Sequence, residues 1–457
     1  MRRIPVENYS FPVYEDYDVI RAWNWFMSFV SKEGWPKRKA RIEKKLAIEF
    51  RESRPFSESL TKGTLLVDKK DTIGWYLYLI DMIINEPYKY EYYQGSRVIP
   101  IFKRIGIDLE LLKNIKGIEK RVKDLIKKRK NEADALLFEI LTALLWAKNG
   151  YDVSFIEEKT GQKTPDIKAE KEGKTWNIEC KRQSKTSDYS YRETEKRQKM
   201  ISYIGETLIK HNIILDIVFH VELEKLPDTY LRDLLAVKLK LAISGKLVSN
   251  EIVDIDVSFV DLSSIKMHLR KYIVKQNSPM LNSLIGNKPI DSKEFTCGYY
   301  GDFFRIGDGE VNNLYVSDIQ NAYAVYWTCD AEEAINAKAR NVKNQIVKAI
   351  KQFNSEDTAV IHIGMETFEG ATVEKVRLNK IRETIFDLDA TKTKLEWIYL
   401  HYFQAYSPPD QNWIFDETVS LISPLPKAQS PLPIDLMIVP GNEDIVNDTF
   451  HWDRPIP

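Results

Sequence analysis

The chain has 457 residues, and its 67 basic and 67 acidic side chains give a formal net charge of zero at pH 7. Zero net charge excludes a histone-like protein that binds nucleic acid through overall positive charge, although a local basic groove stays compatible with it. With 43% hydrophobic and 29% charged residues and no apolar run of membrane-spanning length, the composition is typical of a soluble globular protein. We therefore expect a cytoplasmic protein of two or three domains, without a membrane partner.

Other classes of site are excluded by the residues present. The three cysteines, Cys180, Cys297 and Cys329, are far apart in sequence, so neither a disulfide framework nor a cysteine zinc site is indicated. No glycine-rich loop followed by Lys and Ser or Thr occurs, which excludes a P-loop motor. The six histidines are scattered, and none is placed as a pair of metal ligands.

Residues 1–115 are predicted to form a mainly helical region. Aromatic and aliphatic residues gather in residues 21–30 and 71–85, as is typical of helices packed into a core. Basic segments lie at residues 35–45 and 113–130. Most charge runs are solvated helix faces, and contact with nucleic acid is the alternative that we keep for these two. The candidate contacts in the second segment are Lys127, Lys128, Arg129 and Lys130.

Residues 131–149 are predicted to form a buried helix. Residues 135–147 are apolar on nearly every side, and Glu139 is the only charge among them. A buried carboxylate without a partner is costly, so Glu139 needs a cation or a hydrogen-bond donor. A shared metal ion would supply one, and the alternative is an ordinary salt bridge or cap in the core.

Three strands are predicted next, at residues 152–157, 166–169 and 176–181. The last two flank a polar turn around Gly173 and therefore form a β-hairpin. Asp166 begins the first strand of this hairpin and lies near enough across the pair to join residues of the second strand.

The second hairpin strand carries a carboxylate and a lysine on one face. Alternate residues of a strand share a face, so Glu179 and Lys181 point the same way while Cys180 points away, as a small buried side chain. Mg²⁺ prefers oxygen ligands, so Asp166, Glu179 and the backbone carbonyl of Cys180 are candidate ligands, and Mn²⁺ can substitute. Lys181 would activate the attacking water and offset charge on a phosphate. These groups favour metal-assisted hydrolysis of a phosphodiester.

The motif and its order of elements resemble the PD-(D/E)XK phosphodiesterase superfamily, which has the restriction-endonuclease-like fold. The residues that carry the resemblance are Glu139 in a helix, then Pro165-Asp166, then Glu179-Cys180-Lys181. The family pattern is a helix, three strands, a helix and a strand, and residues 192–210 and 213–221 are the candidates for its last two elements.

This resemblance implies a mixed α/β fold in which a mixed central sheet is flanked by helices. It assigns the restriction-endonuclease-like core to residues 116–275, after the helical region 1–115 and before a C-terminal α/β region at 290–457 with a proline-rich tail. It implies catalytic roles for Asp166, Glu179, Lys181 and Glu139, with metal ligands among the three carboxylates. The helix at 192–210 would add a basic group to the site, and Arg192 and Lys196 are the candidates.

Within the C-terminal region, residues 330–353 are predicted to form one long helix. Strands are expected at 358–363, 381–386 and 396–406. The proline-rich tail is expected to follow the surface of the molecule and to add no domain.

The function expected from these residues is Mg²⁺-dependent cleavage of DNA, in restriction, anti-phage defence or repair. Cleavage of both strands by one site per chain would favour a homodimer, or partner proteins of a defence system. The alternatives are an RNA nuclease and a non-catalytic nucleic-acid-binding or scaffold protein of the same fold. A separate alternative is that no such site exists: Glu179 and Lys181 are then an exposed charge pair on an edge strand, and Pro165-Asp166 is a plain turn.

Overall fold

The computed structural model describes most of the chain. The described residues are 14–51, 70–157, 164–183, 187–241, 243–276, 278–287, 297–305, 314–339, 341–354, 356–367, 369–388, 394–406, 414–425, 429–434, 436–439 and 450–453. No helix among them is long and apolar enough to cross a bilayer.

Every described element before residue 115 is a helix, as expected. Aspartates begin two of these helices: Asp16 accepts from the backbone N–H of Val19, and Asp71 accepts from that of Gly74. The elements are α1 (Tyr17–Met27), α2 (Gly34–Arg51), α4 (Thr72–Asn85), η2 (Pro87–Lys89), α5 (Tyr92–Ile107) and α6 (Leu109–Lys113). They lead into α7 (Ile118–Lys127) and the apolar helix α8 (Ala133–Lys148).

The first sheet has the strand order β1-β2-β3-β10-β11-β12. β3 pairs with β10 and β10 with β11 in parallel, whereas the outer pairs are antiparallel. Glu172 and Gly173 have positive φ angles of 51° and 78°, as a tight two-residue hairpin turn between β2 and β3 requires. The strands are β1 (Asp152–Phe155), β2 (Ile167–Lys171), β3 (Lys174–Gln183), β10 (Thr358–Glu366), β11 (Lys394–Tyr406) and β12 (Ile414–Ile422).

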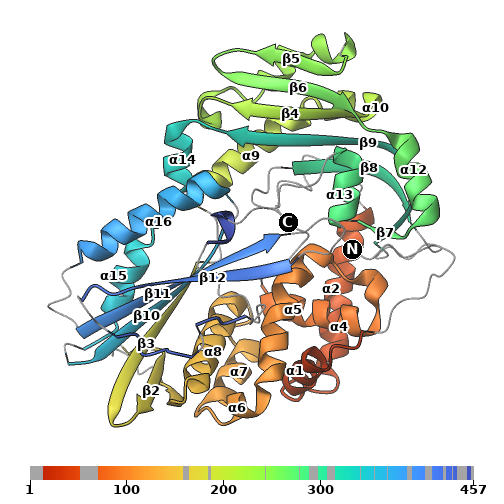
Figure 1. Cartoon of the computed structure of the whole chain (residues 1–457). Coiled ribbons are helices and arrows are strands. Elements are labelled where there is room, and N and C mark those ends of the chain that lie inside the picture. The colour runs from red at the N-terminus through yellow and green to blue at the C-terminus, as the bar shows by residue number, and fades with distance from the viewer. Residues whose placement is uncertain are drawn as a thin grey trace.

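The second sheet has the order β5-β6-β4-β9-β7, and β8 also pairs with β9. Figure 1 shows this sheet above the first one, with β9 as its longest strand. Its strands are β4 (Ile213–Phe219), β5 (Gly245–Ser249), β6 (Val253–Phe259), β7 (Val274–Lys275), β8 (Cys297–Arg305) and β9 (Tyr315–Cys329). Its accompanying elements are α9 (Asp188–Ser202), α10 (Gly205–His211), η3 (Leu223–Lys225), α11 (Tyr230–Leu235), η4 (Lys238–Leu241), α12 (Leu262–Lys271) and α13 (Pro279–Gly286).

Helices cover both faces of the first sheet (Figure 1). On one face, α8 shares a buried cluster with Ile178 and Cys180 of β3. Gly364 of β10 permits this contact, because a Cβ atom there would lie 2.6 Å from the ring of Phe138. The other face is covered by α15 and α16, whose apolar residues pack on Ile361 and Ile363. The elements on this side are α14 (Glu332–Lys338), α15 (Lys343–Ile350) and α16 (Ala371–Phe386).

The strand expected at 213–221 is present as β4, but it belongs to the second sheet. The strand beside β3 is β10, with Ile361 opposite Glu179. Each sheet therefore takes strands from widely separated parts of the chain, and the first sheet draws on both sides of the boundary expected near residues 275–290. Two apolar strands such as β4 and β10 look alike in sequence, and only the fold decides which one pairs with β3.

Two further elements differ from expectation. Residues 330–353, expected as one long helix, contain two helices, α14 and α15, and Asp330 just before α14 lies 3.0 Å from His220 Nδ1. Residues 381–386, expected as a strand, are the last part of α16. The buried residues Leu378, Ile381 and Ile385 have helical spacing, which six residues taken alone do not reveal.

Candidate active site

Asp166 is held against the backbone of β3. It lies just before β2, where its N–H donates to the carbonyl of Ile178 at 3.0 Å. In return, the N–H of Cys180 donates to Asp166 Oδ2 at 2.8 Å. The carboxylate is therefore fixed at the sheet position where Glu179 and Lys181 emerge, as the hairpin predicted.

Glu179 is a buried carboxylate, only 2% exposed, on the same face of β3 as Lys181. Its Oε1 pairs with Lys181 Nζ, while its Oε2 has no hydrogen-bond partner among the described residues. Burial first, and then the negative charges of Asp166 and Glu139, raise the pKa of Glu179 to about 8. The pair is thus not the exposed surface pair of the alternative interpretation, because its carboxylate is desolvated.

Lys181 is a cation in this arrangement. Although burial works against its charged form, the adjacent carboxylate of Glu179 outweighs that cost and raises the pKa of Lys181 above its usual range. A lysine of this kind is suited to offsetting negative charge and to donating hydrogen bonds, not to accepting a proton at neutral pH.

Glu139 on α8 has the cation that its burial demands. Arg121 Nη1 of α7 lies 3.2 Å from Glu139 Oε2, and the two side chains are only 11% and 8% exposed. The guanidinium of Arg121 also lies 5.0 Å from the ring centroid of Phe155 on β1. The core salt bridge expected as an alternative is therefore present, and a direct metal contact of Glu139 stays a prediction.

Cys180 points to the α8 face and is buried, as predicted for a small filler. Burial, followed by the nearby charges of Asp166 and Glu139, raises the pKa of its thiol well above the ordinary value, so the thiol is unreactive. The proposed use of its carbonyl as a metal ligand stays a prediction.

The residues present fit a divalent cation. Among the described residues, no three His, Cys, Asp or Glu side chains already form a metal-binding group. Two carboxylates, Asp166 and Glu179, nevertheless lie close enough for the charge of Asp166 to raise the pKa of Glu179, and a buried oxygen of Glu179 lacks a partner among the described residues. One or two carboxylates are what Mg²⁺ usually takes from a protein, and a cation would relieve the repulsion that raises the pKa of Glu179.

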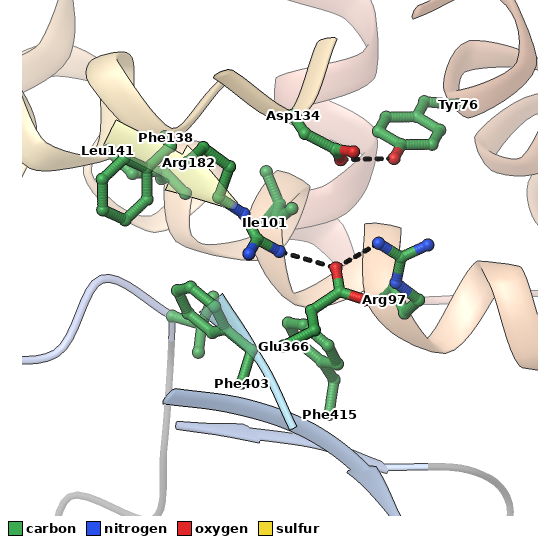
Figure 2. A pocket seen from close by; sticks show the side chains of 11 residues that line it. Tyr76, Arg97, Ile101, Asp134, Phe138, Leu141, Arg182, Glu366, Phe403 and Phe415 are labelled. Carbon is green, nitrogen blue, oxygen red and sulfur yellow. Dashed lines mark hydrogen bonds and ion pairs between the residues drawn. The ribbon is translucent and has the colours of Figure 1, made fainter. Parts of the chain in front are cut away.

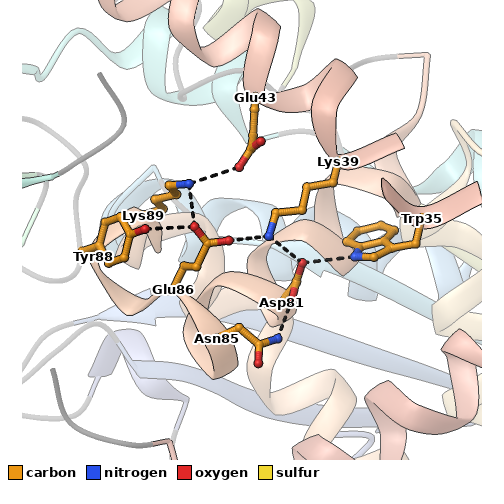
Figure 3. A network of polar contacts seen from close by, with 8 residues as sticks. All are labelled: Trp35, Lys39, Glu43, Asp81, Asn85, Glu86, Tyr88 and Lys89. Atoms are coloured by element: carbon orange, nitrogen blue, oxygen red, sulfur yellow. Dashed lines mark hydrogen bonds and ion pairs between the residues drawn. The ribbon is translucent and has the colours of Figure 1, made fainter. Parts of the chain in front are cut away.

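Part of the first basic segment is occupied inside the fold. Arg38 is ion-paired with Asp71, and Lys39 of α2 binds Glu86 and lies 3.2 Å from Asp81. Figure 3 shows the contacts of Lys39 within a network that joins α2 to α4 and η2. These two cations therefore connect α2 to the helices beside it.

The second segment remains closer to the surface. Lys128 pairs with Asp124 at 2.9 Å and Arg129 with Glu132 at 2.6 Å, and the partners in each pair are three or four residues apart. On α9, two candidates have acidic partners as well: Arg192 pairs with Glu224 and Lys196 with Asp228. Contact with nucleic acid stays a prediction for Lys127, Lys128, Arg129, Lys130, Arg192 and Lys196.

A small pocket is lined by Arg182 of β3 (Figure 2). Alternation along the strand places Arg182 on the opposite face of β3 from Lys181. At its wall, Glu366 accepts from Arg97 and, at 2.6 Å, from Arg182. Across the pocket, the hydroxyl of Tyr76 donates to Asp134 Oδ1 at 2.5 Å. Sequence reasoning missed this group, because alternation along β3 places Arg182 on the other face but does not say what it meets.

A buried polar chain runs from α8 across β10, β11 and β12. Trp146 Nε1 donates to His362 Nε2 at 3.1 Å, His362 Nδ1 lies 2.9 Å from His401 Nε2, and His401 Nδ1 lies 2.6 Å from Glu417 Oε1. An indole N–H can only donate, so Nε2 of His362 must accept and its proton is on Nδ1. That N–H donates to Nε2 of His401, which in turn donates from its own Nδ1 to Glu417. Burial lowers the pKa of His362 well below its ordinary value, which keeps it neutral.

The chain of hydrogen bonds also fastens the C-terminal segment. Glu417 Oε2 accepts from the backbone N–H groups of Ile438 at 2.8 Å and Val439 at 2.9 Å. Nearby, the hydroxyl of Tyr151 donates to the carbonyl of Pro431 at 2.8 Å. Residues 431–434 and 438–439 thus lie beside the C-terminal end of α8 and β12, whereas Phe450 and Trp452 contact Tyr402 of β11. No sequence pattern indicates this series of hydrogen bonds, since its two histidines are far apart in the sequence.

Comparisons with known proteins identify no relative. No family model matches the chain, and neither a curated protein nor a solved structure shows significant similarity to it. The function must therefore be argued from the geometry and charges of the site itself.

Proposed function

We propose that this protein is a Mg²⁺-dependent nuclease that hydrolyses phosphodiester bonds of DNA, with Mn²⁺ able to replace Mg²⁺. The observation that carries the proposal is the buried carboxylate of Glu179. It stands beside a second carboxylate, Asp166, and a cation, Lys181, with one oxygen lacking a partner among the described residues and its pKa raised. Half-satisfied buried charges of this kind are typical of functional sites and costly elsewhere.

The order of elements supports the resemblance to the PD-(D/E)XK superfamily. A buried helix, α8, precedes β1, β2 and β3, and a parallel strand, β10, lies beside β3. On this proposal, the second sheet is an insertion between β3 and the parallel strand that completes the core. The motif residues lie just before β2 and within β3, close to their places in the family pattern.

Each residue then has a role in hydrolysis. Asp166 and Glu179 would hold the metal ion, and Glu139 would support them from α8. When bound, the metal would supply Lewis-acid stabilisation of the phosphate and a position for the attacking water. Lys181 would exchange its contact with Glu179 for the water or a phosphate oxygen, where its positive charge offsets the charge that develops during attack.

The testing experiment is a nicking assay on supercoiled plasmid with the full-length protein. We expect cleavage with Mg²⁺ or Mn²⁺ and none with EDTA, since both the ligands and the water require the cation. Single-stranded and double-stranded RNA of similar length are assayed in parallel, and preferential cleavage of RNA would replace DNA as the substrate. Binding without cleavage of either, in every divalent cation, would favour the non-catalytic alternative.

A biological setting in restriction, anti-phage defence or repair is part of the same proposal, as is assembly into a homodimer for cleavage of both strands. Linear product from a single binding event would support two sites acting together, whereas accumulation of nicked circles would support one site acting alone.

A further inference from the structure

Arg121 differs from the other cations of α7. Its neighbours Lys120 and Lys123 are largely exposed and pair with Glu157 at 2.6 Å and Glu119 at 3.0 Å, out in solvent. Arg121 instead points inward to Glu139, beside the ring of Phe155. A cation that gives up solvent for a buried carboxylate and an aromatic face is fixed in place, because both contacts restrict the planar guanidinium.

Charge balance shows what this cation does at the site. In the metal-bound site all three carboxylates are ionised, so Asp166, Glu179 and Glu139 contribute three negative charges. Lys181 and Arg121 contribute two positive charges, and the side chains together carry one net negative charge. One divalent cation would change that to one net positive charge, which matches the single negative charge of a phosphodiester. Two divalent cations would leave three positive charges in a half-buried site, without the ligands to hold them.

We propose that Arg121 keeps Glu139 out of the metal's ligand shell and supplies the second positive charge at the scissile phosphate, so that each chain holds one divalent cation and not two. This inference rests on the proposed nuclease function. In two-metal sites, the second ion stabilises charge on the reacting phosphate, and a guanidinium presents fixed N–H donors for the same purpose. Arg121 is a positioning residue for Glu139 and a candidate contact of the phosphate.

The test counts bound Mn²⁺ by electron paramagnetic resonance and measures plasmid cleavage on the same preparations of full-length protein. The wild-type protein should bind one tight Mn²⁺ per chain. Arg121→Gln should gain a second, weaker Mn²⁺, because Glu139 is released to act as a ligand, and its cleavage should fall by roughly 10²-fold as one charge-stabilising group is removed. Arg121→Lys, which retains the charge, should keep one Mn²⁺ and more of the activity.

Two further variants control the count. Arg121→Gln combined with Glu139→Gln should return the protein to one Mn²⁺, because the released carboxylate is gone. Lys120→Gln removes the adjacent cation, whose partner is Glu157, and should leave the count at one.

The outcomes separate this inference from the nuclease proposal. Two tight Mn²⁺ ions in a wild-type protein that cleaves DNA would overturn the inference and leave the nuclease standing. The same holds if Arg121→Gln cleaves at the wild-type rate with one Mn²⁺. A wild-type protein that neither binds Mn²⁺ nor cleaves would overturn both. If Arg121→Gln does not fold, the number of Mn²⁺ ions bound by the wild-type protein and by Arg121→Lys still tests the inference.

Discussion

Two regions of the first sheet bury a carboxylate, and the two carboxylates differ in how many of their oxygens have hydrogen-bond partners. On β12, Glu417 is 1% exposed, and both of its oxygens accept hydrogen bonds, one from His401 and the other from two backbone N–H groups. On β3, Glu179 is equally buried, yet only one of its oxygens has a partner among the described residues.

On the proposed function, this is the difference between a structural charge and a functional one. Buried polar groups in a stable core are almost always satisfied, and Glu417 is satisfied from three directions. Glu179 instead stands beside other carboxylates, in an arrangement that lowers stability unless a cation is added. We therefore expect substitutions in the two regions to have opposite consequences for stability and activity.

The largest expected effect is the loss of cleavage in Asp166→Asn. The amide keeps an oxygen to accept from the N–H of Cys180 but removes the carboxylate proposed to bind the metal, so plasmid cleavage should be abolished. In EDTA this variant should melt at the wild-type temperature or above, because one of the repelling charges is gone, and it should lose most of the stabilisation by Mg²⁺. Melting well below wild type with cleavage intact would make Asp166 a turn residue and remove the site.

Lys181→Ala should lower the rate of cleavage by roughly 10²-fold or more, because it removes the charge proposed to offset the developing charge on phosphate. The rate is measured at saturating Mg²⁺, with Lys174→Ala at the start of the same strand as control. Wild-type rates in Lys181→Ala would withdraw its assignment.

The matched pair Glu417→Gln and Glu179→Gln tests the comparison directly. Glu417→Gln should lower the free energy of unfolding by about 1–3 kcal/mol, because its amide N–H groups meet either backbone N–H donors or His401. Turning His401 and His362 to accept would only move the clash to the indole of Trp146, which cannot accept. Glu179→Gln in EDTA should be neutral or stabilising, as measured by urea unfolding. Equal destabilisation of both variants would contradict the distinction between Glu417 and Glu179.

The two regions should also respond to pH in opposite directions. The pKa of Glu179 is raised from 4.5 to about 8, so the metal-free folded state keeps a proton that the unfolded chain loses, and stability should fall as pH rises through this range. The pKa of His362 is lowered from 6.5, so its contribution to stability is lost as pH falls below 6.5.

Between pH 6.5 and 8, only the first of these two effects operates, with a slope of at most about 1.4 kcal/mol per pH unit. Melting in EDTA across this window should therefore show a decline for wild type and a flatter profile for Glu179→Gln. Identical slopes for the two proteins would assign the decline to other groups.

The smallest expected effect concerns the surface near the site. If Lys127, Lys128, Arg129 and Lys130 bind phosphates, neutralising them should make the DNA affinity less sensitive to salt. The slope of log affinity against log salt concentration should become less negative by about 0.9 for each phosphate that is no longer bound. Affinity is measured at several salt concentrations with the metal replaced by Ca²⁺. An unchanged slope would leave these residues as solvated helix positions.

Local pattern predicted the site's immediate elements well. The hairpin and α8 occur close to their expected positions because turn residues, alternation and a wholly apolar helix are local signals. Arg121 was hidden in a run of basic residues. Helical spacing from the buried Ile118, Val122 and Leu125 could have set it apart from its neighbours.

What the sequence could not provide is the pairing of distant segments. The partner of β3 had several apolar candidates, and β4 was the nearer one along the chain, yet β10 is the one that pairs. The series of hydrogen bonds that links Trp146 to Glu417 likewise depends on three strands, β10, β11 and β12, that pair in register. Such contacts are set by tertiary packing, which a single sequence does not encode locally.

The late position of β10 has a consequence for synthesis on the ribosome. A nascent chain that ends before residue 358 already contains every strand of the second sheet, but its β3 still lacks its parallel neighbour. Domains tend to form as their last segment emerges, so the second sheet can close while the first waits. The apolar residues of β3 are then an open edge that invites aggregation. On the proposed function, an unfinished chain would lack the strand that lies beside Glu179 and Lys181, and it would not yet hold the assembled site.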